Sequence, residues 1–382
     1  MRESNTSARH QKAFSRGYHL LRLTGLLASC ACVAQAAPQT RGGDARAVTV
    51  GDAAELAKVL KQADPPAVVL LKPGDWDRIK LTGIRPERPI TIRSAVPSSP
   101  AVIRYLSIGD SQGLRFVDIT FNVRPGSLAV GLSRSSDIRF DQLNVHGILD
   151  GDPTHDGGGM TIRNTNDVAI TNSFFHDLTG GITFIEVKGI KVQGNRFELL
   201  RSDGIHGTRV SQAVISGNAF TNFHPVGPDH PDAVQFWTTG PVPMRDIRIS
   251  DNQFVRGDGK RIQGIFLGDE SGAGYENVQI TGNAILGGMY HGIRVVHGVG
   301  VLVADNLVLG YRDMVSWIMI KDSEDVSVRD NRATGYIVKD YPLAKHGNRK
   351  VKQPEVGDIS ELQAWRSRRA AAAAAAPGGN SH

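Results

Sequence analysis

A repeated segment recurs through most of this sequence and limits the folds open to it. Nine stretches of one type, among them Val168–Asp177, Ile190–Leu199 and Val326–Gly335, alternate apolar and polar residues around one marked position. That position holds Asp118, Asp141, Asn172, Asn195, Asn218, Asn252, Asn283, Asn306 and Asn331. Its basal spacing is 23 residues, with longer steps where loops are inserted. A unit this short can bury its apolar side only by stacking on a neighbour, which indicates a solenoid.

The coils of this solenoid are predicted to consist of strands. Apolar and polar residues alternate with a period of two, and β-branched residues are frequent, both of which favour strands over helices. We expect the asparagines at the marked position to stack along the axis and to pair their side-chain amides. Their role is then structural.

A second strand follows in each repeat, and aligning its copies places side chains in columns. The second positions are all apolar and are predicted to point inward: Met160, Ile182, Ile205, Val234, Ile265, Ile293 and Ile318. The third positions then point outward by alternation: Thr161, Thr183, His206, Gln235, Phe266, Arg294 and Met319. A residue just before each segment forms another outward column: Gly158, Gly180, Asp203, Asp232, Gln263, His291 and Ser316.

These columns predict one exterior face that carries most of the reactive side chains. Its polar members are Asp203, His206, Asp232, Gln235, His291 and Arg294. Trp237, two residues beyond Gln235, offers a stacking surface for a sugar ring. The insertion Phe223–Pro231 carries His224, Asp229 and His230 and is positioned to fold over the face as a lid. A face of this length suits an extended polymer better than a small metabolite.

The N-terminal segment Val48–Trp76 combines an expected amphipathic helix with a Leu-x-Pro-Gly first strand. Asp52 and Glu55 form a capping-box pair, and Leu56, Val59 and Leu60 make one apolar face of that helix. With the repeats, this segment resembles the pectate-lyase-like family of right-handed parallel β-helices. The resemblance implies an all-β, single-stranded right-handed parallel β-helix over residues 37–345, with a short N-terminal capping helix and a C-terminal helical tail.

Polysaccharide lyases and uronan epimerases of that group, which the chain resembles, remove the C5 proton of a uronic acid. Such a reaction needs a group that neutralises the carboxylate, a base, and, for chain cleavage, an acid. We expect His206, between Asp203 and Asp232, to be the base, with His230 second, and His291 or Tyr290 to donate the proton. The expected substrate-binding residues are Gln235, Trp237, Arg294, His224 and Tyr290. His155 and Asp156 form a lesser cluster at the far end of the face.

Neutralisation of the uronate carboxylate has two candidate sources. Asp203, Asp229 and Asp232 offer oxygen ligands for Ca²⁺, a hard cation. Alternatively, Arg294 and Gln235 bind and neutralise the carboxylate without a metal.

Four functions remain open at this point. The expected function is an exported polysaccharide lyase acting by β-elimination on an alginate-, pectate- or exopolysaccharide-like polymer. A C5-epimerase would use nearly the same residues. A glycoside hydrolase would use Asp203 with Asp229 or Asp232 as acid and base. In a non-catalytic carbohydrate-binding β-helix, Asp203 and Asp232 would be turn residues and His206 an exposed residue paired with an aspartate.

The first 36 residues predict export. Five basic residues precede the apolar run Leu23–Val33, and Ala34-Gln35-Ala36 is a small-x-small cleavage signal, as in a secretory signal peptide. Leu27–Cys30 also fits the lipoprotein pattern, so lipid anchoring at Cys30 is the alternative. Both cysteines, Cys30 and Cys32, lie in this leader, so the mature chain is expected to be stable without disulfides in the periplasm or outside the cell.

The net charge of +6 comes largely from the leader, because the rest of the chain has 39 basic and 37 acidic residues. This balance gives no reason to expect nucleic acid as a partner. Nothing after the leader approaches the roughly 18 apolar residues of a membrane span. We expect a monomer whose partner is an acidic polysaccharide.

The C-terminal residues 346–382 differ in character from the repeats. A basic linker leads to Ser360–Gln363, a capping-box start, and then to a short helix that runs into an alanine tract. We expect this helix to cover the open end of the solenoid, because such ends need protection. The alanine tract and the residues after it form a low-complexity tail.

Overall fold

The structure is a computed structural model, and it describes residues 47–375. The predicted signal peptide, with the alternative lipid site at Cys30, lies outside the described residues. The described residues belong to the second of two compact units, residues 42–382.

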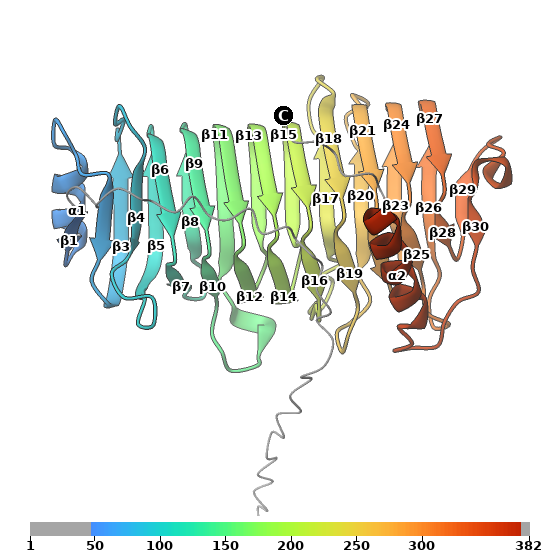
Figure 1. The fold of residues 1–382 in the computed structure, drawn as a ribbon, viewed down its shortest axis with the longest axis horizontal. Helices are drawn as coiled ribbons and strands as arrows, with labels where there is room; N and C mark the ends of the chain where they lie inside the picture. Colours follow the sequence, from blue (N-terminus) through green and yellow to red (C-terminus); the bar gives the residue numbers. More distant parts are fainter. Residues whose placement is uncertain (1–46, 376–382) are drawn as a thin grey trace, which may run out of the picture. The chain divides into compact units, whose positions relative to one another are not determined.

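Across residues 47–375, thirty parallel strands wind into a stack of coils, and their pairing forms three ladders (Figure 1). The first ladder comprises β3 (Gly74–Thr82), β5 (Ala101–Gly109), β8 (Leu128–Ser133), β11 (Gly158–Thr171), β13 (Ile182–Gln193), β15 (Ile205–Ser216), β17 (Asp232–Thr238), β20 (Gln263–Asp269), β23 (Tyr290–Val296), β26 (Ser316–Lys321) and β29 (Tyr336–Val338). The candidate site lies on the outer side of this ladder.

The second ladder comprises β1 (Ala47–Val50), β2 (Val68–Leu71), β4 (Ile90–Ser94), β6 (Gln112–Val117), β9 (Ser136–Asp141), the second halves of β11, β13 and β15, then β18 (Met244–Ser250), β21 (Tyr275–Thr281), β24 (Gly298–Ala304) and β27 (Glu324–Arg329). The third ladder comprises β7 (Thr120–Asn122), β10 (Asn144–His146), β12 (Phe174–Leu178), β14 (Arg196–Leu200), β16 (Ala219–Thr221), β19 (Gln253–Val255), β22 (Ala284–Leu286), β25 (Leu307–Leu309), β28 (Arg332–Ala333) and β30 (Arg349–Lys350).

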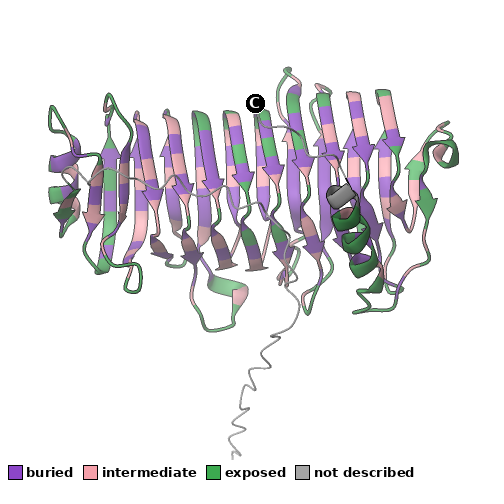
Figure 2. Cartoon of the chain, in the orientation of Figure 1, coloured by how far each residue is buried: buried purple, intermediate pink, exposed green. Residues whose placement is uncertain are grey.

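The core fills the inside of the coils, and burial alternates along the strands (Figure 2). Aromatic rings stack from coil to coil on the third ladder, with centroids 4.7–5.1 Å apart between Phe175, Phe197, Phe220 and Phe254. Each ring thus buries its faces against identical neighbours at the spacing of stacked strands.

The predicted asparagine ladder is confirmed, with a correction to its members. Seven buried asparagines form it, and the Nδ2 of each of the first six donates to the Oδ1 of the next at 2.9 or 3.0 Å: Asn195, Asn218, Asn252, Asn283, Asn306, Asn331 and Asn348. In the coil before them the position belongs to Ser173, whose backbone N–H donates to Asn195 Oδ1.

Three earlier positions assigned to this column are wrong: Asp118 and Asn172 by one residue, and Asp141 by two, because the register aligns Ile119 and Leu143 with Ser173. Asn172 is exposed and its neighbour Ser173 is buried. A stacked phenylalanine lies two residues after Ser173, Asn195, Asn218 and Asn252, and this buried ring marks the register better than residue identity does.

The register predicted for the candidate site is confirmed. Thr161, Thr183, His206, Gln235, Phe266, Arg294 and Met319 are paired in sequence across seven coils. The other outward column shifts near its end, because a bulge between His291 and Ile293 pairs Ser316 with Tyr290 and Trp317 with His291.

In the described part of the chain, two helices and two 3₁₀ turns accompany the strands. Helix α1 (Ala53–Leu60) begins at Asp52, whose carboxylate accepts from two backbone N–H groups of the first turn, and it buries Leu56, Val59 and Leu60. The 3₁₀ turns are η1 (Pro153–His155) and η2 (Leu343–His346).

Helix α2 (Ser360–Ala375) does not cover the end of the solenoid, so that expectation is wrong (Figure 1). Its buried Leu362 and Trp365 pack sideways on outward residues of β22 and β25, namely Ala284, Leu286, Leu307 and Leu309, together with Tyr311. An apolar side patch therefore decides where the helix docks.

The coils also continue past residue 345, since β30 pairs with β28 and Asn348 extends the asparagine ladder. Among the described residues, no helix is long and apolar enough to cross a membrane.

Candidate functional site

The site begins on the coil of Asp203 and His206, at the start of β15. Asp203 Oδ1 accepts the backbone N–H of Asp232 from the next coil at 2.8 Å. Both Asp203 and His206 are half-buried. Burial raises the pKa of Asp203, and burial lowers the pKa of His206 although Asp203 opposes that shift. His206 is therefore neutral at pH 7, the state in which an imidazole can accept a proton.

On the next coil, Asp232 and Gln235 are far less accessible than the alternation predicts. Asp232 has no exposed surface and Gln235 is 8% exposed. Gln235 Nε2 donates to Asp232 Oδ2 at 2.6 Å, while Asp232 Oδ1 has no hydrogen-bond partner. The prediction that they face solvent is wrong, because an outward side chain can still be covered by larger neighbours on adjacent coils. Burial raises the pKa of Asp232 well above its usual range.

The centre of the site is Phe266, which was not among the predicted site residues. The Arg294 guanidinium lies over its ring, 4.5 Å from the centroid. The Trp237 and His291 rings also contact it, each with a centroid separation of 5.3 Å. Phe266 thus holds an arginine, an indole and an imidazole together across three coils.

The guanidinium of Arg294 has few partners for its charge and its N–H groups in this arrangement. It is half-buried, its Nε has no partner, and Asp232 and Tyr275 are the groups that favour its charged form against burial. A guanidinium with unused donors on a partly dry surface is a strong site for a carboxylate.

His291 is oriented by its neighbour on the preceding coil. Its Nδ1 is hydrogen-bonded to Gln263 Oε1. Because an amide oxygen only accepts, Nδ1 carries the hydrogen and Nε2 is left as the acceptor. Burial lowers the pKa of His291 to about 4, and the charge of Arg294 adds to this shift.

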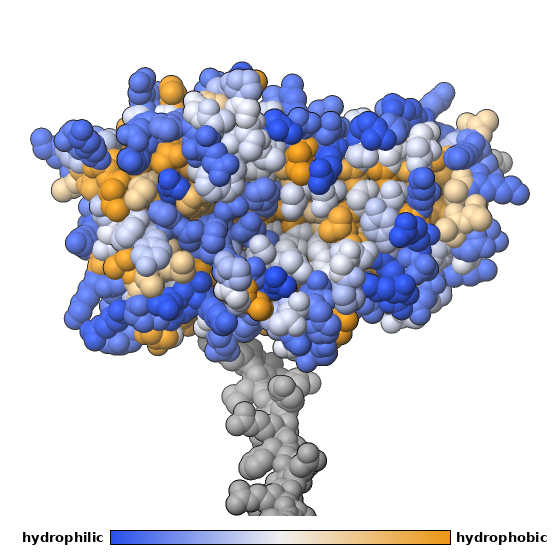
Figure 3. Space-filling model, turned by 180° about the vertical axis from the view of Figure 1, so that it is seen from behind, coloured by the Kyte–Doolittle hydropathy of each residue, from blue (hydrophilic) through white to orange (hydrophobic). Residues whose placement is uncertain are grey.

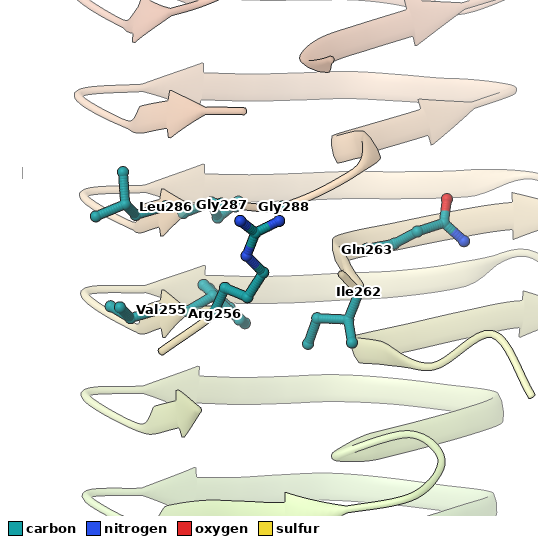
Figure 4. Close-up of a pocket in the computed structure, with 9 residues that line it drawn as sticks. Val255, Arg256, Ile262, Gln263, Leu286, Gly287 and Gly288 are labelled. Carbon is teal, nitrogen blue, oxygen red and sulfur yellow. The ribbon is translucent and has the colours of Figure 1, made fainter. Parts of the chain in front are cut away.

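Gln263 and Arg256 point toward the next coil, and a small cavity of about 10 Å³ lies beside them (Figure 4). Its lining also includes Ile262, Leu286 and Gly287. A cavity of this size holds about one water molecule, so it supports the side chains and does not bind a sugar.

Two aromatic positions flank Phe266 along the solenoid axis. Trp237 extends over Gly268 on the following coil, where an added Cβ would lie 2.9 Å from the indole. On the other side, Tyr290 is 43% exposed and its ring lies 5.9 Å from that of Trp317.

An ion pair holds the predicted lid, Phe223–Pro231, against the coil before it. Arg201 Nε donates to Asp229 Oδ2 at 2.7 Å, and its Nη1 donates to Thr154 O in the loop that carries His155 and Asp156. His230 is exposed and His224 is half-buried. Burial raises the pKa of Asp156 to about 6. This lesser cluster lies in a loop that Arg201 joins to the predicted lid.

Asp203, Asp229 and Asp232 do not form a calcium-binding set in this conformation. The bond from Arg201 lowers the pKa of Asp229 and occupies one of its oxygens, and Asp232 is enclosed by protein. Among residues 47–375, no group of three or more His, Cys, Asp or Glu side chains is arranged to hold a metal ion.

A second carboxylate–imidazole pair, which was also not predicted, lies at the far end of the same strands. The buried Asp269 carboxylate accepts from Thr238 Oγ1 and the backbone N–H of Gly272, and His297 Nδ1 lies 2.6 Å from its Oδ2. These bonds hold the pKa of Asp269 low despite its burial.

The predicted columns contained Gln263 and Phe266, and only their side-chain contacts show that they belong to the site. Seen from behind, the molecule is mostly hydrophilic, with hydrophobic patches scattered between the polar groups (Figure 3).

Comparison with known proteins supports the fold. A family model described as "Right handed beta helix region" matches residues 106–227. No curated protein matches the chain.

Among solved structures, the surface adhesin PfbA of Streptococcus pneumoniae is similar, with a TM-score of 0.56, 13% identity, and coverage of 82% of this chain and 96% of that one. The periplasmic alginate epimerase AlgG has a TM-score of 0.43, 14% identity, and coverage of 80% and 83%. The PL6 family alginate lyase AlyGC has a TM-score of 0.42, 13% identity, and coverage of 80% and 53%. Identities this low show the fold alone, and the right-handed parallel β-helix that the resemblance implied is confirmed.

Proposed function

Because the chain has a right-handed parallel β-helix fold with an arginine and oriented imidazoles along one outer face, we propose that it is an exported polysaccharide lyase. Its substrate is a uronate-containing polysaccharide, cleaved by β-elimination. The observation that carries this proposal is Phe266, which holds the Arg294 guanidinium and the His291 imidazole against one ring.

In the proposed reaction, Arg294 pairs with the uronate carboxylate and makes the C5 proton more acidic. His291 Nε2 accepts that proton. The C5–H electrons form the C4–C5 double bond as the C4–O bond breaks. The leaving oxygen takes a proton from Tyr290, the exposed hydroxyl next to His291, or from water.

His291 replaces His206 as the preferred base. Arg294 and His291 both contact the ring of Phe266. His206 lies three coils before Arg294, and its register partner on the next coil is Gln235. Adjacent coils are about 4.8 Å apart, which places His206 about 14 Å from Arg294, beside a more distant sugar of the same chain. We assign His206 and Asp203 to substrate binding there.

The hydrolase alternative has less support from these residues. It requires a second carboxyl group facing the substrate, but Asp229 is bound to Arg201 and Asp232 is buried. An epimerase shares the first step and differs only in returning the proton to the opposite face.

The test is to incubate the mature protein with alginate, pectate, glucuronan and acidic exopolysaccharides, with and without EDTA. We expect ultraviolet absorbance from an unsaturated uronate, unaffected by EDTA, and lost in His291→Ala. New reducing ends without absorbance would reject the lyase, and C5 inversion by NMR without cleavage would assign an epimerase. Binding without chemistry, unchanged in His291→Ala, would leave a carbohydrate-binding protein.

A further inference from the structure

Tyr290 has an unusual backbone for an aromatic residue. Its φ is +41°, in the left-handed region that residues other than glycine rarely adopt. It begins β23 directly before the bulge between His291 and Ile293. Bulges re-aim side chains and are frequent beside active sites, and strained residues persist where the surrounding structure requires them. Here the strain presents the ring on the outer face.

The partner of Tyr290 is Trp317, on the following coil. Trp317 is half-buried, and its ring lies 5.9 Å from Tyr290 and 6.4 Å from His291. The pair therefore extends the site by one coil beyond Arg294.

Unpaired polar atoms are concentrated at this end of the face. Within residues 47–375, five buried side-chain atoms lack a hydrogen-bond partner, and two of them, Arg294 Nε and Trp317 Nε1, belong to outward side chains of adjacent coils. Native proteins leave few such groups unpaired, so two on adjacent coils single out this end of the face for a ligand.

The spacing of the coils indicates that the ligand is an extended polysaccharide. Adjacent coils lie about 4.8 Å apart, close to the advance of one sugar along an extended polysaccharide. A pyranose ring also has C–H groups on its faces, which pack on aromatic rings. A chain running along the solenoid would place its next sugar at Trp317.

We propose that Tyr290 and Trp317 form a subsite that stacks the pyranose ring adjacent to the uronate held by Arg294. This subsite rests on the proposed function. It sets the minimum length of a good substrate and the direction in which the polymer lies.

The test compares oligouronides of increasing length by calorimetry in a His291→Gln background, so that the ligand persists. Trp317→Leu keeps bulk and removes the ring, Trp317→Phe keeps a ring, and Tyr290→Ala removes the exposed partner. We expect Trp317→Leu and Tyr290→Ala to lose about three- to tenfold in affinity, only for oligomers long enough to reach this coil. Trp317→Phe should remain near the parent value, and thermal melting confirms that each variant is folded.

Equal affinities for the parent and Trp317→Leu at every length would overturn the subsite and leave the proposed function standing. The same conclusion follows if Trp317→Leu weakens the shortest ligands as much as the longest. If no oligouronide binds any of these proteins, the proposed function fails and the subsite fails with it.

Discussion

At the scale of single residues, burial determines the protonation states on which the proposed chemistry depends. Burial keeps His206 and His291 neutral at pH 7 and raises the pKa of Asp203 and Asp232. Arg294 remains the cation of this cluster, because a guanidinium keeps its proton even when partly buried. The same outer face thus offers neutral acceptors and one fixed positive charge.

Replacing Arg294 by Lys tests the role of that charge. Lysine keeps the charge but loses the planar fork and the contact with Phe266, so we expect kcat/KM on a uronate polymer to fall about 100-fold or more. The matched control is Arg248→Lys, an exposed arginine on the second ladder. Equal activity of the two variants in the absorbance assay would contradict the assignment of Arg294.

His291 should make stability depend on acid pH. Its pKa is about 6.5 in the unfolded chain and about 4 in the folded protein, so the unfolded chain binds a proton first as pH falls. The stability associated with neutral His291 is complete above pH 6.5 and is lost between pH 6.5 and 4. For a half-exposed side chain we expect a loss of roughly 1–2 kcal/mol. Urea unfolding at both pH values should show a smaller difference in His291→Gln, and an identical difference would count against a depressed pKa.

At the scale of elements, each coil is held to the next by repeated contacts of one kind. The asparagine ladder and the phenylalanine stack do this for the third ladder and the turn before it. Each ladder amide bonds to a backbone carbonyl as well as to the next amide, as Asn283 does with Ile249. The ladder therefore satisfies buried polar groups that the turn would otherwise leave unpaired.

Asn283→Ala should show the cost of breaking that ladder. The change leaves buried groups of Asn252 without their acceptor, and each such group costs about 1–3 kcal/mol. We expect a total loss of about 2–4 kcal/mol in chemical unfolding. Asn166→Ala, at an exposed position on β11, is the control and should change stability by less than about 0.5 kcal/mol. Similar effects of the two changes would argue against the ladder as a structural support.

At the scale of the whole molecule, apolar residues on the side of the solenoid must be covered from solvent. Outward residues of β22 and β25 are apolar, whereas those of β14 are charged and those of β28 include Arg332. Helix α2 covers this apolar patch, and it is fixed at its edges by Arg332 with Glu361 and by Arg369 with Asp251. Helix α2 is thus part of the folded structure.

Deleting residues 352–382 should expose the apolar patch and cause self-association. Light scattering coupled to size exclusion should show oligomers that grow with concentration. Deleting only residues 372–382, beyond Leu362 and Trp365, is the control and should behave like the full chain. A monodisperse monomer from the longer deletion would show that α2 is not needed to cover this side.

The sequence by itself determined the solenoid and the register of its first ladder. Its repeat, its alternation and its inward apolar column follow from local rules, since strands of period two can stack only with one face inside. The columns that hold Asp203, His206, Gln235 and Arg294 were therefore predicted residue by residue.

Only the tertiary structure decided which of these side chains work together. It buried Asp232 and Gln235, paired Asp229 with Arg201, placed Phe266 at the centre and laid α2 along the side. The physical reason is that alternation fixes the direction of a side chain, whereas accessibility and pKa depend on the size and charge of neighbours one or two coils away. Those neighbours are 20 to 60 residues distant along the chain and about 5–10 Å distant in space.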